Sequence, residues 1–126
     1  MAEKRFIIEL GTGVDLHGQD ATKAASRAVK DAVSHGCLCG LLEIVQLRDP
    51  EEMRVEVLVA VPEPEHVRVD EVLTMIPFGR KGLRVVQGGL QAPGMDLPEL
   101  GDEPSDVIVA NAAVTVWVEL EEPVGR

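Results

Sequence analysis

Apolar and polar residues alternate in patterns that predict most elements of the chain. An apolar run at residues 5–10 predicts a short buried strand that ends in a turn at the glycines after it. From Asp20 to Gly36, small apolar residues recur every three or four positions. This period predicts a helix with Asp20 as its N-cap and Gly36 just beyond its C-terminus. Because most of its apolar stripe is alanine, we expect the helix to lie close on a sheet.

Two runs in the middle of the chain predict neighbouring strands. Residues 38–47 read LCGLLEIVQL, apolar at odd and even positions alike, which is typical of a central strand covered on both faces. Residues 53–61 place Met or Val at every second position, which predicts a strand with one buried face. Only RDPEE separates the two runs, so we expect a hairpin.

The second half of the chain predicts one more helix and two more strands. Pro64 is a favourable first residue for a helix that Pro77 stops. Residues 82–90 predict a strand broken by two glycines, and residues 106–120 predict a long strand with one apolar face. Fully extended, the last strand would span more than about 40 Å, so either it bends near Asn111 or its end pairs with another subunit.

The resulting order, β-α-β-β-α-β-β, predicts an α+β fold. We expect a two-layer sandwich in which two helices cover one face of a mixed or antiparallel sheet. The length fits one domain, residues 1–126, and residues 91–106 predict a long loop rich in Pro, Gly and acidic residues. Trp117 faces away from the apolar stripe of its strand, and a large ring there needs its own cover, which favours a homo-oligomer.

Composition and charge exclude several classes of function. A net charge of −10 disfavours binding to nucleic acid, which needs clustered Lys and Arg. No stretch reaches the roughly 18 apolar residues of a membrane helix, so we expect a cytoplasmic protein without membrane contact. Cys37 and Cys39 lack the Cys-x-x-Cys spacing, so we expect reduced, partly buried thiols; a metal site completed by His35 is the alternative.

The stretch GTGVDLHG, residues 11–18, is the main candidate site. Glycines let a ligand approach the main chain, and the following helix directs its N-terminal amides at the same place. Asp15 and His17 could serve as base and acid or as two metal ligands. The candidate ligand-binding residues here are Gly11, Thr12, Gly13 and Gly18. Alternatively, the glycines serve only a tight turn and His17 is solvated.

Further candidates lie outside this stretch. Arg80 and Lys81 are adjacent cations flanked by glycines, which suits either the capture of a carboxylate or phosphate or a solvated turn. Gln87 precedes a pair of glycines, Gly88 and Gly89, which predict a bulge or a close approach of ligand to main chain.

At Gly11, Gly13, Asp15, His17 and Gly18 the chain resembles a conserved family of uncharacterised proteins from bacteria and plants, which shares a Gly-x-Gly-x-Asp-x-His-Gly motif. That resemblance covers nearly the whole chain and implies no established activity.

A weaker resemblance is to one repeat of the ring-opening amidohydrolases, the cyanuric acid hydrolase and barbiturase group. It follows the order of the alanine-rich helix, LLEIVQLRDP and RVVQGGLQAPG. It implies three α/β units around a central site, here supplied by a homotrimer. Arg48 stands where that group's lysine is expected and Gln87 where its serine is expected, so its hydrolytic chemistry does not carry over directly.

These observations lead to one main hypothesis about function. We expect a homo-oligomer, trimer or higher, that binds a small polar or anionic molecule on residues 11–18 near a subunit interface, with countercharge from Arg48, Arg80 or Lys81. Two alternatives remain. The first is a hydrolase-like or metal-dependent enzyme that uses His17 and Asp15, and the second is a non-catalytic structural protein that acts through its acidic loop.

Overall fold

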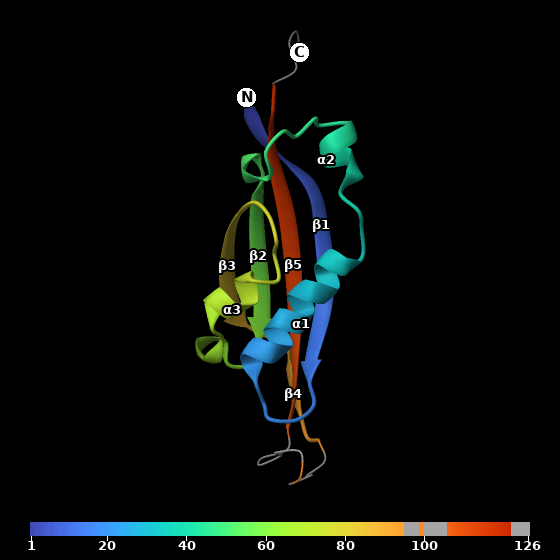
Figure 1. Ribbon diagram of the computed structural model, residues 1–126. Coiled ribbons are helices and arrows are strands. Elements are labelled where there is room, and N and C mark those ends of the chain that lie inside the picture. Colours follow the sequence, from blue (N-terminus) through green and yellow to red (C-terminus); the bar gives the residue numbers. More distant parts are fainter. Residues whose placement is uncertain (95–98, 100–105, 122–126) are drawn as a thin grey trace.

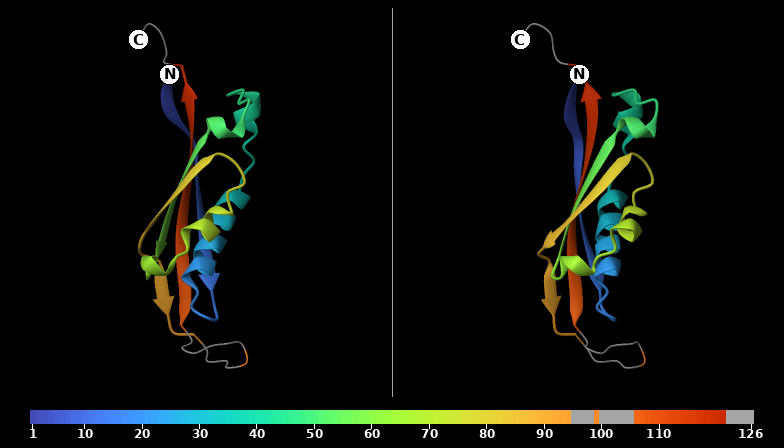
Figure 2. Two further views of the ribbon diagram at one scale, coloured as in Figure 1. Left: turned by 60° about the vertical axis from the view of Figure 1, so that its left-hand side comes forward. Right: turned by 90° about the vertical axis from the view of Figure 1, so that its left-hand side faces the viewer.

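The computed structural model describes residues 1–94, 99 and 106–121, and it confirms the α+β fold (Figure 1). Five strands form a mixed sheet in the order β1-β5-β2-β3, with β4 paired to β5. Only β2 and β3 are parallel among the described strand pairs. The helices all lie on one face of the sheet (Figure 2). The strands are β1 (Ala2–Asp15), β2 (Arg54–Val61), β3 (Arg80–Gln87), β4 (Leu90–Ala92) and β5 (Val107–Leu120); the helices are α1 (Ala21–Ser34), α2 (Cys39–Glu43) and α3 (Val69–Leu73).

The centre of the fold is a long antiparallel ribbon of β1 and β5. The two strands pair from Ala2 opposite Leu120 to Asp15 opposite Ile108, with one register shift between Arg5 and Ile7. The first strand is therefore longer at both ends than predicted. The end of β5 pairs with β1 of its own chain, which accommodates the length of the strand within one chain.

Glycines inside β1 allow α1 to pack directly on the strand. A Cβ atom on Gly11 would lie 2.3 Å from the carbonyl oxygen of Ala28, and one on Gly13 would lie 2.1 Å from that of Ala24. Both distances are impossible for a real side chain. The predicted turn at these glycines is wrong because the strand continues through them, and their small size serves the contact with α1.

The strand predicted at residues 38–47, and its hairpin with the next strand, are also wrong. This segment contains the short helix α2, and it buries Leu41 while Leu42 and Ile44 stay exposed. An apolar run without a period fits a strand or a helix equally well. The sheet decides between them, because β2 already has β5 on one side and β3 on the other.

The second predicted helix is divided in two. A 3₁₀ turn, Pro64–His66, precedes α3. Between them the Thr22 hydroxyl donates to the His66 carbonyl oxygen at 3.3 Å and accepts from the Arg68 N–H at 2.9 Å. These bonds satisfy backbone groups that a continuous helix would have paired internally.

The predicted strand 82–90 becomes two strands. Gly88 and Gly89 carry the chain from β3, which pairs with β2, to β4, which pairs with β5. Gly89 has φ +67°, and a Cβ atom there would lie 2.2 Å from the Val109 carbonyl oxygen. The predicted acidic loop starts later than expected, because β4 includes residues 91 and 92; residues 95–98 and 100–105 of that loop lie outside the described residues.

The two faces of the sheet differ. Valines and alanines under the helices form the core, whereas Ile8, Leu10 and Leu90 are largely exposed on the other, open face. Trp117 lies on this open face between the guanidinium groups of Arg5 and Arg54, at 5.6 and 5.1 Å from the ring centroid. Within the described part of the chain, no helix has the length and apolarity needed to cross a membrane.

Candidate functional site

A hollow of about 630 Å³ lies where β1 ends and α1 begins. Asp15 closes β1, His17 follows in the turn, and α1 contributes Lys23 and Arg27 one helical turn apart. Val14 and Leu16 complete the wall. The structure thus brings together the predicted pair, Asp15 and His17, and adds two cations that the sequence analysis did not assign to the site.

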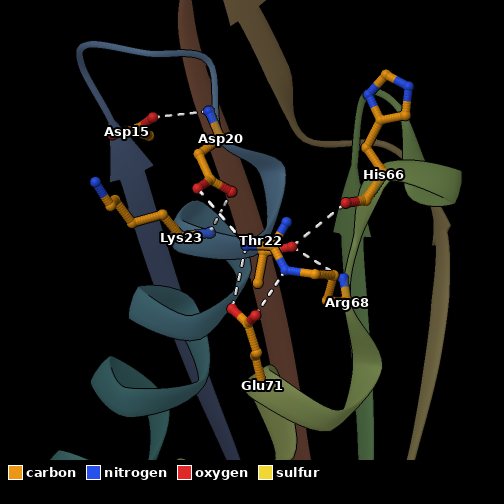
Figure 3. A network of polar contacts seen from close by, with 7 residues as sticks. All are labelled: Asp15, Asp20, Thr22, Lys23, His66, Arg68 and Glu71. Carbon is orange, nitrogen blue, oxygen red and sulfur yellow. Dashed lines mark hydrogen bonds and ion pairs between the residues drawn. The ribbon is translucent and has the colours of Figure 1, made fainter.

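Asp15 organises this corner of the fold. Its side chain is buried, and its Oδ2 accepts a hydrogen bond from the backbone N–H of Asp20 at 2.8 Å (Figure 3). Arg27 Nη1 lies 3.6 Å from Asp15 Oδ1 and donates to the Val14 carbonyl oxygen at 2.6 Å. The carboxylate therefore closes the turn and holds a guanidinium at the wall of the hollow.

The turn itself has an unusual backbone. Gly18 has φ +93° and Gln19 has φ +48°, and residues other than glycine rarely adopt a positive φ. In the described part of the chain, Gln19 Oε1 is buried and accepts no hydrogen bond. Gln19 was not predicted, and only the glycine before it hinted at a left-handed turn.

The N-terminus of α1 is occupied by a residue of the chain. Asp20 is the predicted N-cap, and its Oδ1 accepts from the Lys23 N–H at 3.1 Å. Arg68 Nη2 lies 4.0 Å from Asp20 Oδ2 and binds Glu71 through Nε at 2.7 Å, which lowers the pKa of Glu71 (Figure 3). At least one amide that was expected to serve a ligand is thus used for capping.

Some predicted residues of the same stretch lie elsewhere on β1. Gly11 and Gly13 both face α1. Gly11 also lines a separate depression, together with Thr12 and Asp31. The Thr12 N–H donates to Asp31 Oδ2 at 2.9 Å, and this bond is the main cause of a lowered pKa of Asp31. Asn111, the polar residue in β5, donates to Thr12 Oγ1 at 3.3 Å.

The predicted cations outside the stretch lie far from the hollow. Across the sheet, Arg80 lies beside Arg54, which pairs with Trp117 of β5. Asp15 pairs with Ile108 of the same strand. About nine residues of β5 separate Trp117 from Ile108, so Arg80 and Asp15 are roughly 30 Å apart along the strands. The exposed Arg48 belongs to the segment before β2, at the end of the sheet where β1 begins (Figure 1). Within one chain these residues do not converge with His17.

Arg80 and Lys81 also point in opposite directions, as neighbours in a strand do. Lys81 Nζ donates to the carbonyl oxygens of Leu73 and Ile76 at 3.1 and 2.7 Å, at the C-terminal end of α3. Arg80 Nε donates to the Glu51 carbonyl oxygen at 2.9 Å. They do not form the paired anion clamp that their adjacency indicated. Gln87, Gly88 and Gly89 lie at the junction of β3 and β4 and do not line the hollow.

A second hollow, of about 700 Å³, lies over β2 and β3 on the open face. Arg54, Arg80 and Arg84 line it together with Glu56. Arg54 is bound to Glu3 at 2.8 Å and to Glu56 at 3.0 Å, and its hydrogen bonds lower the pKa of Glu3. Carboxylates of the chain therefore already offset part of its positive charge.

The cysteines are exposed and free, not partly buried as expected. Among the described residues, the one group of three or more side chains with metal-ligand spacing is Glu63, Glu65 and His66, and all three are exposed. Exposed acidic groups of this kind are common without a metal.

Comparisons with known proteins identify the family of the chain and a solved structure that resembles it. Residues 5–116 match the family described as "Conserved hypothetical protein (Lin0512_fam)". No curated protein matches the chain. A crystal structure from Nostoc punctiforme PCC 73102, described as an FtsZ-like protein of unknown function, is 52% identical, with a TM-score of 0.86 over 95% of this chain and 99% of that chain. The expected membership of an uncharacterised family is confirmed: the chain belongs to the conserved hypothetical Lin0512 family.

Proposed function

We propose that this protein binds a small anionic molecule, such as a phosphate or carboxylate compound, in the hollow between β1 and α1. The observation that carries the proposal is the meeting of Lys23, Arg27 and His17 around one cavity in a protein whose net charge is −10. A volume of about 630 Å³ is in the usual range for small-molecule sites.

The side chains fit an anion better than a metal. Arg27 is held by Val14 and Asp15, so its guanidinium is ordered before a ligand arrives. Lys23 adds a charge from the same helix face, since side chains four residues apart are neighbours. A divalent cation bound by Asp15 and His17 would be repelled by both cations, which disfavours the metal-dependent alternative.

Lys23→Ala tests the ligand, with Lys30→Ala as a matched control because Lys30 is an exposed lysine of the same helix that does not line the hollow. The purified protein is titrated with inorganic phosphate, citrate and a sugar phosphate by calorimetry. We expect Lys23→Ala to weaken binding about 10-fold, as for one lost charge-assisted contact, and Lys30→Ala to leave it unchanged. Equal losses in the two variants, or no binding of any anion by the native protein, would contradict the proposal.

We also propose that the open face of the sheet is where two copies of the chain meet. Ile8, Leu10 and Leu90 leave an apolar surface on it, whereas helices cover the opposite face. Leu16, which lines the hollow, is exposed as well, so the ligand site would lie near the rim of such an interface. Burial of these side chains is the driving force expected for association.

Leu10→Glu tests the interface, with Leu42→Glu on α2 as control because both leucines are 68% exposed. Light scattering after gel filtration measures the mass. We expect an oligomer for the native protein and for Leu42→Glu, and a monomer for Leu10→Glu. A monomeric native protein, or dissociation by Leu42→Glu alone, would refute this interface.

A further inference from the structure

A different cavity, of about 200 Å³, lies near the other end of α1. It is lined by β1, β2, β5, the end of α1 and the segments before α2 and after α3. Except for one residue, its wall is apolar. The side chains used below are Glu9, Val33, Leu38, Ile76, Phe78 and Val114.

The exception is Glu9. It is 8% exposed, and no described residue makes a hydrogen bond to its carboxylate. Burial raises the pKa of Glu9, and the charge of His35 only partly offsets this. A Cβ atom on Gly36 would lie 3.5 Å from Glu9 Oε2, so the carboxylate lies close to the chain just beyond α1.

The Glu9 side chain is largely buried, and native folds normally give such a side chain a hydrogen-bonding partner. The apolar wall offers Glu9 no donor within the fold. The cavity provides both the space and the surface for a ligand that would supply one.

We propose that this cavity binds a small primary amine with a compact apolar body. The ammonium group donates to the Glu9 carboxylate, and the body packs among Val33, Ile76 and Val114. An anion would be repelled by Glu9, and a neutral ligand would leave the carboxylate without a charged donor.

Size limits the ligand further. A cavity of about 150 Å³ accepts benzene, so about 200 Å³ accepts a body of roughly six to eight non-hydrogen atoms. Phe78 is one of the exposed large apolar residues and lines this cavity next to Pro77, which places an aromatic ring at its mouth. A branched alkylamine or an arylmethylamine meets these limits.

The test uses benzylamine and benzyl alcohol, which share their shape and differ in charge. Binding to the native protein is followed at pH 7 by chemical shifts of backbone amides, with Gly36 and Leu38 as reporters. We expect benzylamine to bind at least about 10-fold more tightly than the alcohol, as for one hydrogen bond between charged groups. Equal affinities, tighter binding of the alcohol, or no shift with either ligand would overturn the proposal.

Glu9→Gln then keeps the volume and removes the charge, with Glu43→Gln, an exposed acid on α2, as control. We expect the preference for benzylamine to disappear in Glu9→Gln and to remain in Glu43→Gln. Persistence of the preference in a folded Glu9→Gln variant would overturn the assignment. If that variant does not fold, the comparison of the two ligands in the native protein still decides. Lys23→Ala should not change amine binding, which separates this site from the anion site.

Discussion

Two acidic residues of β1 show how the fold treats buried charge in different ways. Glu9 and Asp15 are six residues apart on the face that α1 covers, and they are 8% and 3% exposed. Asp15 meets an N–H of the turn and a guanidinium, whereas Glu9 meets an apolar wall. Equal burial therefore does not mean an equal role. The partner that the fold supplies makes Asp15 structural, and the lack of one leaves Glu9 available for a ligand.

The largest effect should come from Gly13, which lies between the two acids under α1. Gly13→Ala places a methyl group against the backbone of Ala24, so the helix must move away from both sites. We expect a loss of about 3 kcal/mol in the free energy of unfolding, measured with denaturant. Gly82→Ala is the control, because a Cβ atom there meets nothing within 4 Å. Similar losses in both variants would mean that α1 does not depend on this close contact.

Removal of Asp15 should have the next largest effect. Asp15→Ala leaves the Asp20 N–H without its acceptor and Arg27 without its ion pair, and we expect a loss of about 2 kcal/mol. Asp15→Asn keeps a side-chain acceptor and should restore part of that loss. If Asp15→Ala were neutral, the difference between the two acids would not be one of hydrogen bonding.

Features that depend on local interactions could be predicted from the sequence, whereas features that depend on long-range contacts could not. Helix α1 was predicted with both of its ends, because a period over many residues and a capping Asp20 are local signals. Asp15 and His17 line the same hollow because side chains only two residues apart in a turn usually stay close together. The length of β1 was not predicted because Gly11 and Gly13 were interpreted as turn residues. These positions need glycine because the strand lies in close contact with α1, which is about 15 residues later in the sequence.

The misplaced cations have the same explanation. The positions of Arg48 and Arg80 relative to His17 depend on the order of strands in the sheet, which no local pattern contains. Two signals were available but not used. Lys23 and Arg27 share a helix face four residues apart, and Glu9 has the same parity in β1 as Asp15. This shared parity places the two acids on the same face of the strand.

The smallest change in the free energy of unfolding should come from Glu9→Gln. Unlike the two preceding substitutions, it should stabilise the protein near neutral pH. The raised pKa of Glu9 means that the folded state binds this proton more tightly than the unfolded state. Its contribution to stability is fully present below the ordinary carboxyl pKa of 4.5 and is lost as the pH rises through the raised value. Relative to the native protein, Glu9→Gln should therefore gain stability as the pH rises.

Glu3→Gln supplies the contrast. The pKa of Glu3 is lowered by its hydrogen bonds from Arg54, so its contribution is present above the ordinary carboxyl pKa and is lost as the pH falls through the lowered value. Denaturation of both variants and the native protein from pH 4 to pH 8 should give differences that change with pH in opposite directions. If both changed in the same direction, Glu9 would have a hydrogen-bonding partner in solution, and the distinction between Glu9 and the paired Asp15 would fail.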